Sequence, residues 1–167
     1  MVPPTNDEDI NILIRDVVEA SKLTAKARST DIRPTVANLA SVIYERGLLP
    51  DGLNELIDLI TAPSHLSQAS LNTLVGNLYP ATRISSDVVV RIVASLGHGQ
   101  LKPSLNLQAA LIRWLILVYH VLESPTVLSQ TYHVLFDLLD TVALRFGRPF
   151  SSLFGLQRVH RQLTAIE

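Results

Sequence analysis

Proline residues divide this chain into segments of helix length. After the pair Pro3-Pro4, prolines follow at positions 34, 50, 63, 80, 103, 125 and 149. Proline is tolerated in the first turn of a helix and breaks a helix interior. Between these positions the apolar residues recur at spacings of three, four and seven rather than two, which places them on one side of a helix. The sequence therefore predicts an all-α fold without a sheet.

The same pattern predicts about eight helices. They are expected at residues 6–25, 34–47, 51–61, 67–79, 85–96, 104–123, 125–146 and 149–165. The first is predicted to begin at Asn6 or Asp7, because Asn6 is a good N-cap and acidic residues suit the first turn. The second is predicted to end at Gly47, a residue suited to the position after a helix. Connections this short favour antiparallel packing of neighbouring helices.

The predicted helices also indicate a repeat. The last three begin at prolines roughly 22–24 residues apart, so a helix pair recurs about every 45 residues, the period of HEAT and armadillo repeats. We therefore expect residues 1–167 to form one domain of HEAT-like antiparallel helical hairpins stacked into a short solenoid, with residues 1–5 disordered. The early helices are shorter, as in terminal repeats. The chain stops without a polar outer cap, so we expect it to be the N-terminal fragment of a longer protein.

Composition narrows the classes of function. The chain has no cysteine, which excludes disulfides, thiolate metal sites and cysteine nucleophiles. The net charge of -1 argues against broad electrostatic binding of nucleic acid. Only 17% of the residues are charged, against about 25% in typical soluble domains. We therefore expect another protein to cover part of the surface. An acidic N-terminus without an apolar segment, and the absence of cysteine, favour the cytosol or nucleus.

One stretch could imitate a membrane span, at residues 105–122. It contains Asn106, Arg113 and His120 at intervals of seven, which places them on one side of a helix. An arginine at the centre of a span costs about 2.5–3.5 kcal/mol on insertion scales. The stretch is therefore predicted to be a buried helix of a protein that does not contact a membrane.

A few side chains could carry chemistry, but their pattern favours a solvated face. His133 and Asp137 lie four positions apart and Asp140 follows one turn on, a spacing that could orient an imidazole or hold a metal. No third ligand or nucleophile is indicated, and Gln130 shares the same stripe. The five histidines lack zinc-binding spacing, and phosphate-loop, dinucleotide and hydrolase motifs are absent. We expect no enzyme activity, no metal and no cofactor.

The end of the chain is basic. Residues 141–167 carry Arg145, Arg148, Arg158 and Arg161 against Glu167, a net charge of +3. This could form a weak patch for nucleic acid or an acidic partner, although a solvated helix end is the commoner cause. Direct DNA binding by this domain is not expected.

Two predicted helices, 104–123 and 125–146, are apolar over more than half of their circumference. In the first, one face combines Leu107, Ala110, Leu111, Trp114, Leu115, Val118 and Leu122, and a second combines Leu105, Ala109, Ile112, Ile116 and Tyr119. Such helices lie at the centre of a fold or are half covered by a partner. Both interpretations stay open at this point.

Several motifs resemble the centromere protein I family. They are SDVVVRI at 86–92, LG at 96–97, KPS at 102–104, QAALIRWL at 108–115, VLSQ at 127–130, Tyr132 and LFDLLDT at 135–141. The resemblance covers about residues 66–145. The combination of KPS with QAALIRWL is its most specific part, whereas residues 1–33 and 146–167 match nothing.

The resemblance implies a non-enzymatic scaffold of the constitutive inner kinetochore, in the nucleus at the centromere. Members of the family are long helical-repeat proteins that assemble with centromere proteins H and K, and in some lineages with M. This chain is much shorter and looks like the N-terminal repeat domain, where the H/K pair is expected to dock.

Large apolar side chains usually dominate such interfaces. The predicted helix 125–146 offers Tyr132, Phe136, Leu139 and Ala143 as candidate partner-binding residues. The second choice is Phe150, Leu153 and Phe154 in the helix that follows. Two alternatives stay open: a generic helical adaptor unrelated to centromeres, and a nucleic-acid-binding module that uses the basic end.

Overall fold

The computed structural model describes residues 6–97, 104–124, 126, 127 and 129. Within these residues it contains six α-helices and a short 3₁₀-helix, and no β-strand. The predicted all-α class is therefore confirmed. The chain divides into two compact units, with the boundary between Ile84 and Ser85, and each unit is described by itself.

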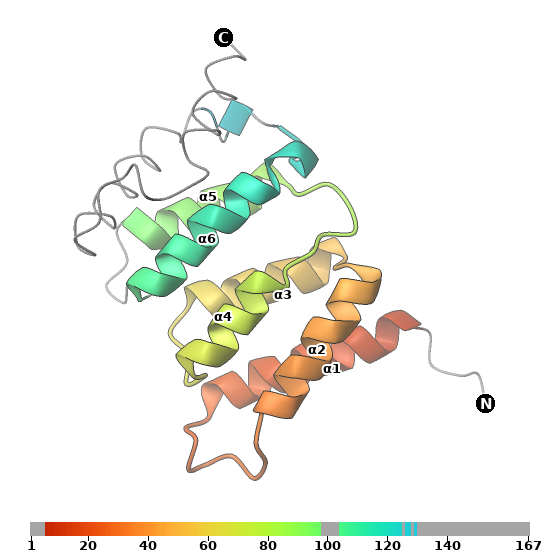
Figure 1. The fold of residues 1–167 in the computed structure, drawn as a ribbon, viewed down its shortest axis with the longest axis vertical. Coiled ribbons are helices and arrows are strands. Elements are labelled where there is room, and N and C mark those ends of the chain that lie inside the picture. The colour runs from red at the N-terminus through yellow and green to blue at the C-terminus, as the bar shows by residue number, and fades with distance from the viewer. Residues whose placement is uncertain (1–5, 98–103, 125, 128, 130–167) are drawn as a thin grey trace. The chain divides into compact units, whose positions relative to one another are not determined.

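The first unit contains α1 (Asn6–Lys22), α2 (Arg33–Arg46), α3 (Pro50–Thr61) and α4 (Gln68–Gly76). Helix α1 packs against both α2 and α3, and α4 packs against the same two helices (Figure 1). The core consists of the apolar stripes that the spacing predicts. Its most buried side chains include Ile14, Val17, Leu39, Ile43, Leu56, Ile57 and Leu74. Burial of these stripes is what holds the four helices together.

The starts of these helices follow local rules. Helices α2 and α3 each carry a proline in the first turn, Pro34 and Pro50. The hydroxyl of Ser67 accepts a hydrogen bond from the Ser70 N–H at the start of α4, at 3.1 Å. Before α2, the Asp31 carboxylate accepts one from the Arg33 N–H at 3.0 Å. Proline therefore marks the starts of α2 and α3, as predicted, and polar side chains bind backbone N–H groups at the starts of α2 and α4.

A parallel β-bridge joins Leu48, which follows α2, to Pro80, which follows α4. The Leu48 N–H donates to the Tyr79 carbonyl at 2.7 Å, and the Ala81 N–H donates to the Leu48 carbonyl at 2.8 Å. Gly47 ends α2, as predicted, and has a positive φ of 76°. The prediction that α4 continues to Tyr79 is wrong, since it ends at Gly76. The residues before Pro80 are drawn out of the helix by the bridge and by the proline itself.

The second unit contains α5 (Ser86–Gly97) and α6 (Leu105–Leu117), which pack together, and the 3₁₀-helix η1 (Tyr119–Val121). The Ser104 hydroxyl caps α6 by accepting from the Leu107 N–H at 3.3 Å. The prediction of one helix to residue 123 is wrong. Val118, at φ -96° and ψ 4°, leaves the α conformation, and the last turn tightens to 3₁₀ before Leu122 becomes extended.

Helix α1 is also shorter than predicted, since it ends at Lys22 rather than residue 25. The predicted helices at 125–146 and 149–165 fall outside the described residues, apart from positions 126, 127 and 129, and so do residues 1–5. In the described part of the chain, no helix has both the length and the apolar character needed to cross a bilayer.

Candidate partner-binding surface

The binding residues predicted from the sequence lie outside the described part of the chain. These are Tyr132, Phe136, Leu139, Ala143, Phe150, Leu153 and Phe154, the arginines 145, 148, 158 and 161, and the set of His133, Asp137 and Asp140. Their positions stay predictions.

Helix α6 shows how a nearly all-apolar helix is accommodated. Leu107, Leu111, Trp114 and Leu115 of its first face are buried, and Ile112 of its second face is only 1% exposed. Asn106, Arg113 and His120 are exposed along one side, as predicted. Leu117 adds a large apolar side chain to that side and is 65% exposed. Most of the apolar circumference of α6 is therefore covered within the chain.

The described residues offer a different exposed apolar cluster in the first unit. Tyr44 near the end of α2 is 73% exposed, and Leu49 and Tyr79 are 46% and 45% exposed. The Tyr44 and Tyr79 rings meet edge to face, with centroids 5.7 Å apart and planes at 74°. All three residues flank the Leu48–Pro80 bridge, and we call them the bridge surface. Aromatic pairs of this geometry are favourable, and they keep large side chains ordered in water.

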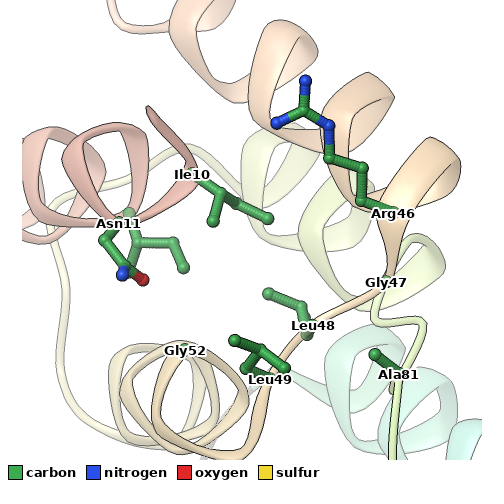
Figure 2. Close-up of a pocket in the computed structure, with 9 residues that line it drawn as sticks. Ile10, Asn11, Arg46, Gly47, Leu48, Leu49, Gly52 and Ala81 are labelled. Carbon is green, nitrogen blue, oxygen red and sulfur yellow. The ribbon is translucent and has the colours of Figure 1, made fainter. Parts of the chain in front are cut away.

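A small pocket of about 60 Å³ lies beside the bridge, between α1, the end of α2 and the start of α3 (Figure 2). Its lining is mainly apolar, with Ile10, Ile14, Leu48, Leu49, Gly52 and Ala81, together with Asn11, Arg46 and Gly47. Cofactor and substrate pockets usually measure about 300–1,000 Å³. This pocket can therefore take the end of one aliphatic side chain, but not a cofactor.

Charges in the described residues form surface pairs and no reactive centre. Arg33 binds Asp31 at 2.7 Å, Lys22 binds Glu19 at 2.6 Å, and Arg91 lies 3.0 Å from Asp87. The Arg33 side chain, by hydrogen bonding to the Asp31 carboxylate, lowers the pKa of Asp31 and raises its own. Within these residues, no group of three or more histidines and acids is placed to hold a metal. Such exposed pairs add little stability.

Sequence reasoning missed the bridge surface because its members come from three segments that only the bridge brings together. One signal was available for Tyr44. It lies one position after Ile43, the last member of the buried α2 stripe of Val36, Leu39, Ala40 and Ile43, and so faces away from the core. No signal in the sequence placed Tyr79 against it.

Comparison with known proteins identifies the chain's relatives. A sequence model of the CENP-I/Mis6 family matches residues 5–145. The inner kinetochore subunit mis6 of Schizosaccharomyces pombe is 36% identical over 102 residues, which cover 60% of this chain and 15% of that protein. Centromere protein I of Gallus gallus is 25% identical over 113 residues, which cover 68% of this chain and 15% of that protein. The family match reaches well into the N-terminal flank that matched nothing by its motifs.

Solved structures agree in fold as well as in sequence. A chain in the crystal structure of the kinetochore subunits Cenp-H/I/K triple complex matches with a TM-score of 0.75 and 53% identity, covering 81% of this chain and 64% of that chain. The crystal structure of centromere protein Cenp-I gives the same values. The names of these relatives are those of kinetochore and centromere proteins.

The family match covers most of the sequence and so excludes an accidental resemblance. The alternative of a generic helical adaptor unrelated to centromeres depended on such an accident and is therefore wrong. The chain belongs to the CENP-I/Mis6 family of inner kinetochore subunits.

Proposed function

We propose that this chain is the N-terminal helical-repeat region of an inner kinetochore scaffold, and that its repeats dock the centromere protein H/K heterodimer during kinetochore assembly. The observation that carries the proposal is the 53% identity, over 81% of this chain, to a chain from a Cenp-H/I/K complex. A scaffold of this kind has no catalytic residues.

The packing of the helices supports this proposal. In the first unit each helix contacts two others, and the helices follow one another through short connections. HEAT-like hairpins stack in this way, each contacting its neighbours along the chain. We propose that residues 1–167 continue as one short solenoid of about eight helices, and that the chain is a fragment of a protein several times longer.

Two surfaces are candidates for the H/K interface. The first is the predicted apolar side of residues 132–143 with residues 150–154, which the sequence favours. The second is the bridge surface of Tyr44, Leu49 and Tyr79, which combines exposed rings with a pocket for one side chain. Interfaces usually draw most of their affinity from a few such anchors. Both surfaces belong to the same proposal and are separated by experiment.

The first test is co-purification of this chain with the H/K pair, analysed by gel filtration with light scattering. The expected result is a stable stoichiometric complex. Separate elution of a chain that is folded by circular dichroism would overturn docking within these 167 residues. A parallel run with the full-length protein then reports whether H/K binds further along the chain.

Variants then distinguish the two surfaces. Phe136→Arg and Phe154→Arg remove the first candidate, and Tyr44→Arg removes the second. Asn38→Arg is the matched control, because Asn38 is an exposed polar residue of α2 outside the bridge surface. We expect the control to bind H/K as the unchanged chain does. Binding that survives all three test variants would exclude both surfaces.

The basic residues Arg145, Arg148, Arg158 and Arg161 give a second, weaker candidate activity, which is nucleic-acid binding. Its signature is an affinity that falls steeply as salt rises, because bound cationic side chains displace counterions. Absence of DNA binding at low salt would exclude it, and this is the result we expect.

A further inference from the structure

One arginine of the loop between α1 and α2, Arg28, forms hydrogen bonds with backbone carbonyls of the first unit. The Arg28 Nε donates to the carbonyls of Ala20, at 2.9 Å, and Leu23, at 3.1 Å. Its Nη2 donates to the carbonyl of His65, in the connection between α3 and α4. The His65 N–H in turn donates to the Ser21 carbonyl at 2.8 Å. These Arg28 contacts join the end of α1 to a loop far along the chain.

Around Arg28 the loop is exposed and carries hydroxyl groups. Ser29 and Thr30 follow it directly, and both are exposed, whereas Arg28 itself is half-buried. Figure 1 shows the loop projecting from the helices of the first unit at the lower edge of the view. Lys26 lies three positions before Ser29 and is also exposed. Basic side chains just upstream of an exposed hydroxyl are what basophilic protein kinases select.

We propose that Ser29 and Thr30 form a phosphorylation site for a basophilic kinase, and that a phosphate here releases Arg28 from its three carbonyls. The hydroxyl oxygen attacks the γ-phosphorus of MgATP, a new O–P bond forms, the bond to the β-phosphate oxygen breaks, and the hydroxyl proton is lost. ADP leaves, and the loop gains a phosphate monoester. The site is independent of the proposed H/K docking.

The release follows from the relative strength of the acceptors. A phosphate monoester carries about -1.5 to -2 charges at neutral pH and three strong acceptor oxygens, and an arginine can bind such a group through two parallel hydrogen bonds. The Asp31 carboxylate does not take the place of the phosphate as an acceptor for Arg28, because Arg33 already binds that carboxylate. Arg28 therefore exchanges three neutral acceptors for one anion within two residues of it.

The same geometry makes opening a condition of phosphorylation. A kinase that binds the Arg28 side chain must first break its hydrogen bonds to the carbonyls of Ala20, Leu23 and His65. The enzyme therefore binds the open form of the loop, and the phosphate then keeps the loop open. Release of Arg28 leaves the His65–Ser21 hydrogen bond to hold the connection between α3 and α4 against the end of α1, so this bond should open more often.

The experiment uses the whole chain, MgATP and the catalytic subunit of cyclic-AMP-dependent protein kinase as the probe. Mass spectrometry locates the phosphate, and hydrogen exchange follows the His65 amide that donates to Ser21. We expect phosphate on Ser29 or Thr30 and about tenfold faster exchange at His65, the loss expected for hydrogen bonds to a charged group. The Ser29→Ala, Thr30→Ala double variant should take up no phosphate in this loop and keep slow exchange.

Arg28→Gln is the second control. It removes the charge, so the His65 amide should exchange fast without any phosphate while circular dichroism stays that of a folded chain. Phosphate found only at other hydroxyls would overturn the site. Phosphate on Ser29 or Thr30 with unchanged exchange at His65 would overturn the release of Arg28.

Discussion

Gly47 holds a backbone conformation that other residues rarely adopt. Its φ of 76° and ψ of 171° belong to a region that is almost restricted to glycine, and an added Cβ would lie 2.9 Å from the Ala81 Cβ. Gly47→Ala is therefore expected to lower the free energy of unfolding by about 1–3 kcal/mol. Urea denaturation followed by circular dichroism measures the change.

Gly76 provides the matched control for that substitution. It is the last residue of α4, and a Cβ built there meets no atom within 4 Å. Gly76→Ala should leave stability unchanged or raise it by up to about 1 kcal/mol, because alanine favours the helix. Equal losses from both substitutions would show that Gly47 has no special backbone requirement.

Asp31 should titrate at unusually low pH. The Arg33 side chain donates to its carboxylate at 2.9 Å and lowers its pKa. A lowered pKa in the folded state means that this pair stabilises the fold above the ordinary pKa of aspartate, and that the contribution is lost as the pH falls through the lowered value. Arg33→Ala should return the pKa toward its usual value, which carboxyl NMR detects. An unchanged titration in this variant would contradict the assigned cause.

At the scale of the element, a side chain that caps the start of a helix should contribute more to the free energy of unfolding than an exposed side chain inside a helix. The Ser104 hydroxyl satisfies the Leu107 N–H at the start of α6. Ser104→Ala should cost about 1 kcal/mol of unfolding free energy, measured by urea denaturation. Ser41→Ala, at an exposed position inside α2, should be neutral or slightly stabilising. A loss at Ser41 as large as that at Ser104 would argue against capping as the cause.

Helix starts were predictable from the sequence to within a residue or two, whereas several ends were not. A start is marked by local chemistry, as with Pro34, Pro50, Ser67 and Ser104. The end of α1 at Lys22 depends on Arg28, which binds the carbonyl of Ala20 from outside the helix and so satisfies an acceptor of its last turns. The end of α4 depends on Leu48. Hydrogen bonds from residues outside the helix contribute to these ends, and the periodicity of apolar residues does not predict such bonds.

At the scale of the whole molecule, we expect substitutions in the bridge surface to change the affinity for H/K much more than the free energy of unfolding. Tyr44 is 73% exposed and Tyr79 is 45% exposed, and neither belongs to the buried core, so replacing both by alanine should change the free energy of unfolding by only about 1 kcal/mol. If H/K docks on this surface, the same double variant should bind at least about tenfold more weakly, the loss typical of an interface anchor. Calorimetry with purified H/K measures it. Unchanged affinity would move the interface to residues 132–154.

The candidate site was less predictable than the fold for a physical reason. Burial imposes a period on the sequence, so core stripes such as Val36, Leu39 and Ile43 can be read from spacing alone. An exposed contact surface imposes no period. The ring of Tyr79 reaches Tyr44 only because a backbone bridge places it there, and the spacing of residues in the sequence gives no sign of that pairing.

The Leu48–Pro80 bridge also bears on the order of folding. Contacts within and between successive helices are local and form early, whereas this bridge joins residues on either side of two helices and must wait for the intervening chain to close. An interaction made after the transition state affects the unfolding rate alone. Gly47→Ala should therefore speed unfolding and leave the folding rate nearly unchanged in stopped-flow measurements. Slower folding would instead place the bridge in the nucleus. On this view the bridge determines the lifetime of the folded unit, through the unfolding rate, and has little effect on the folding rate.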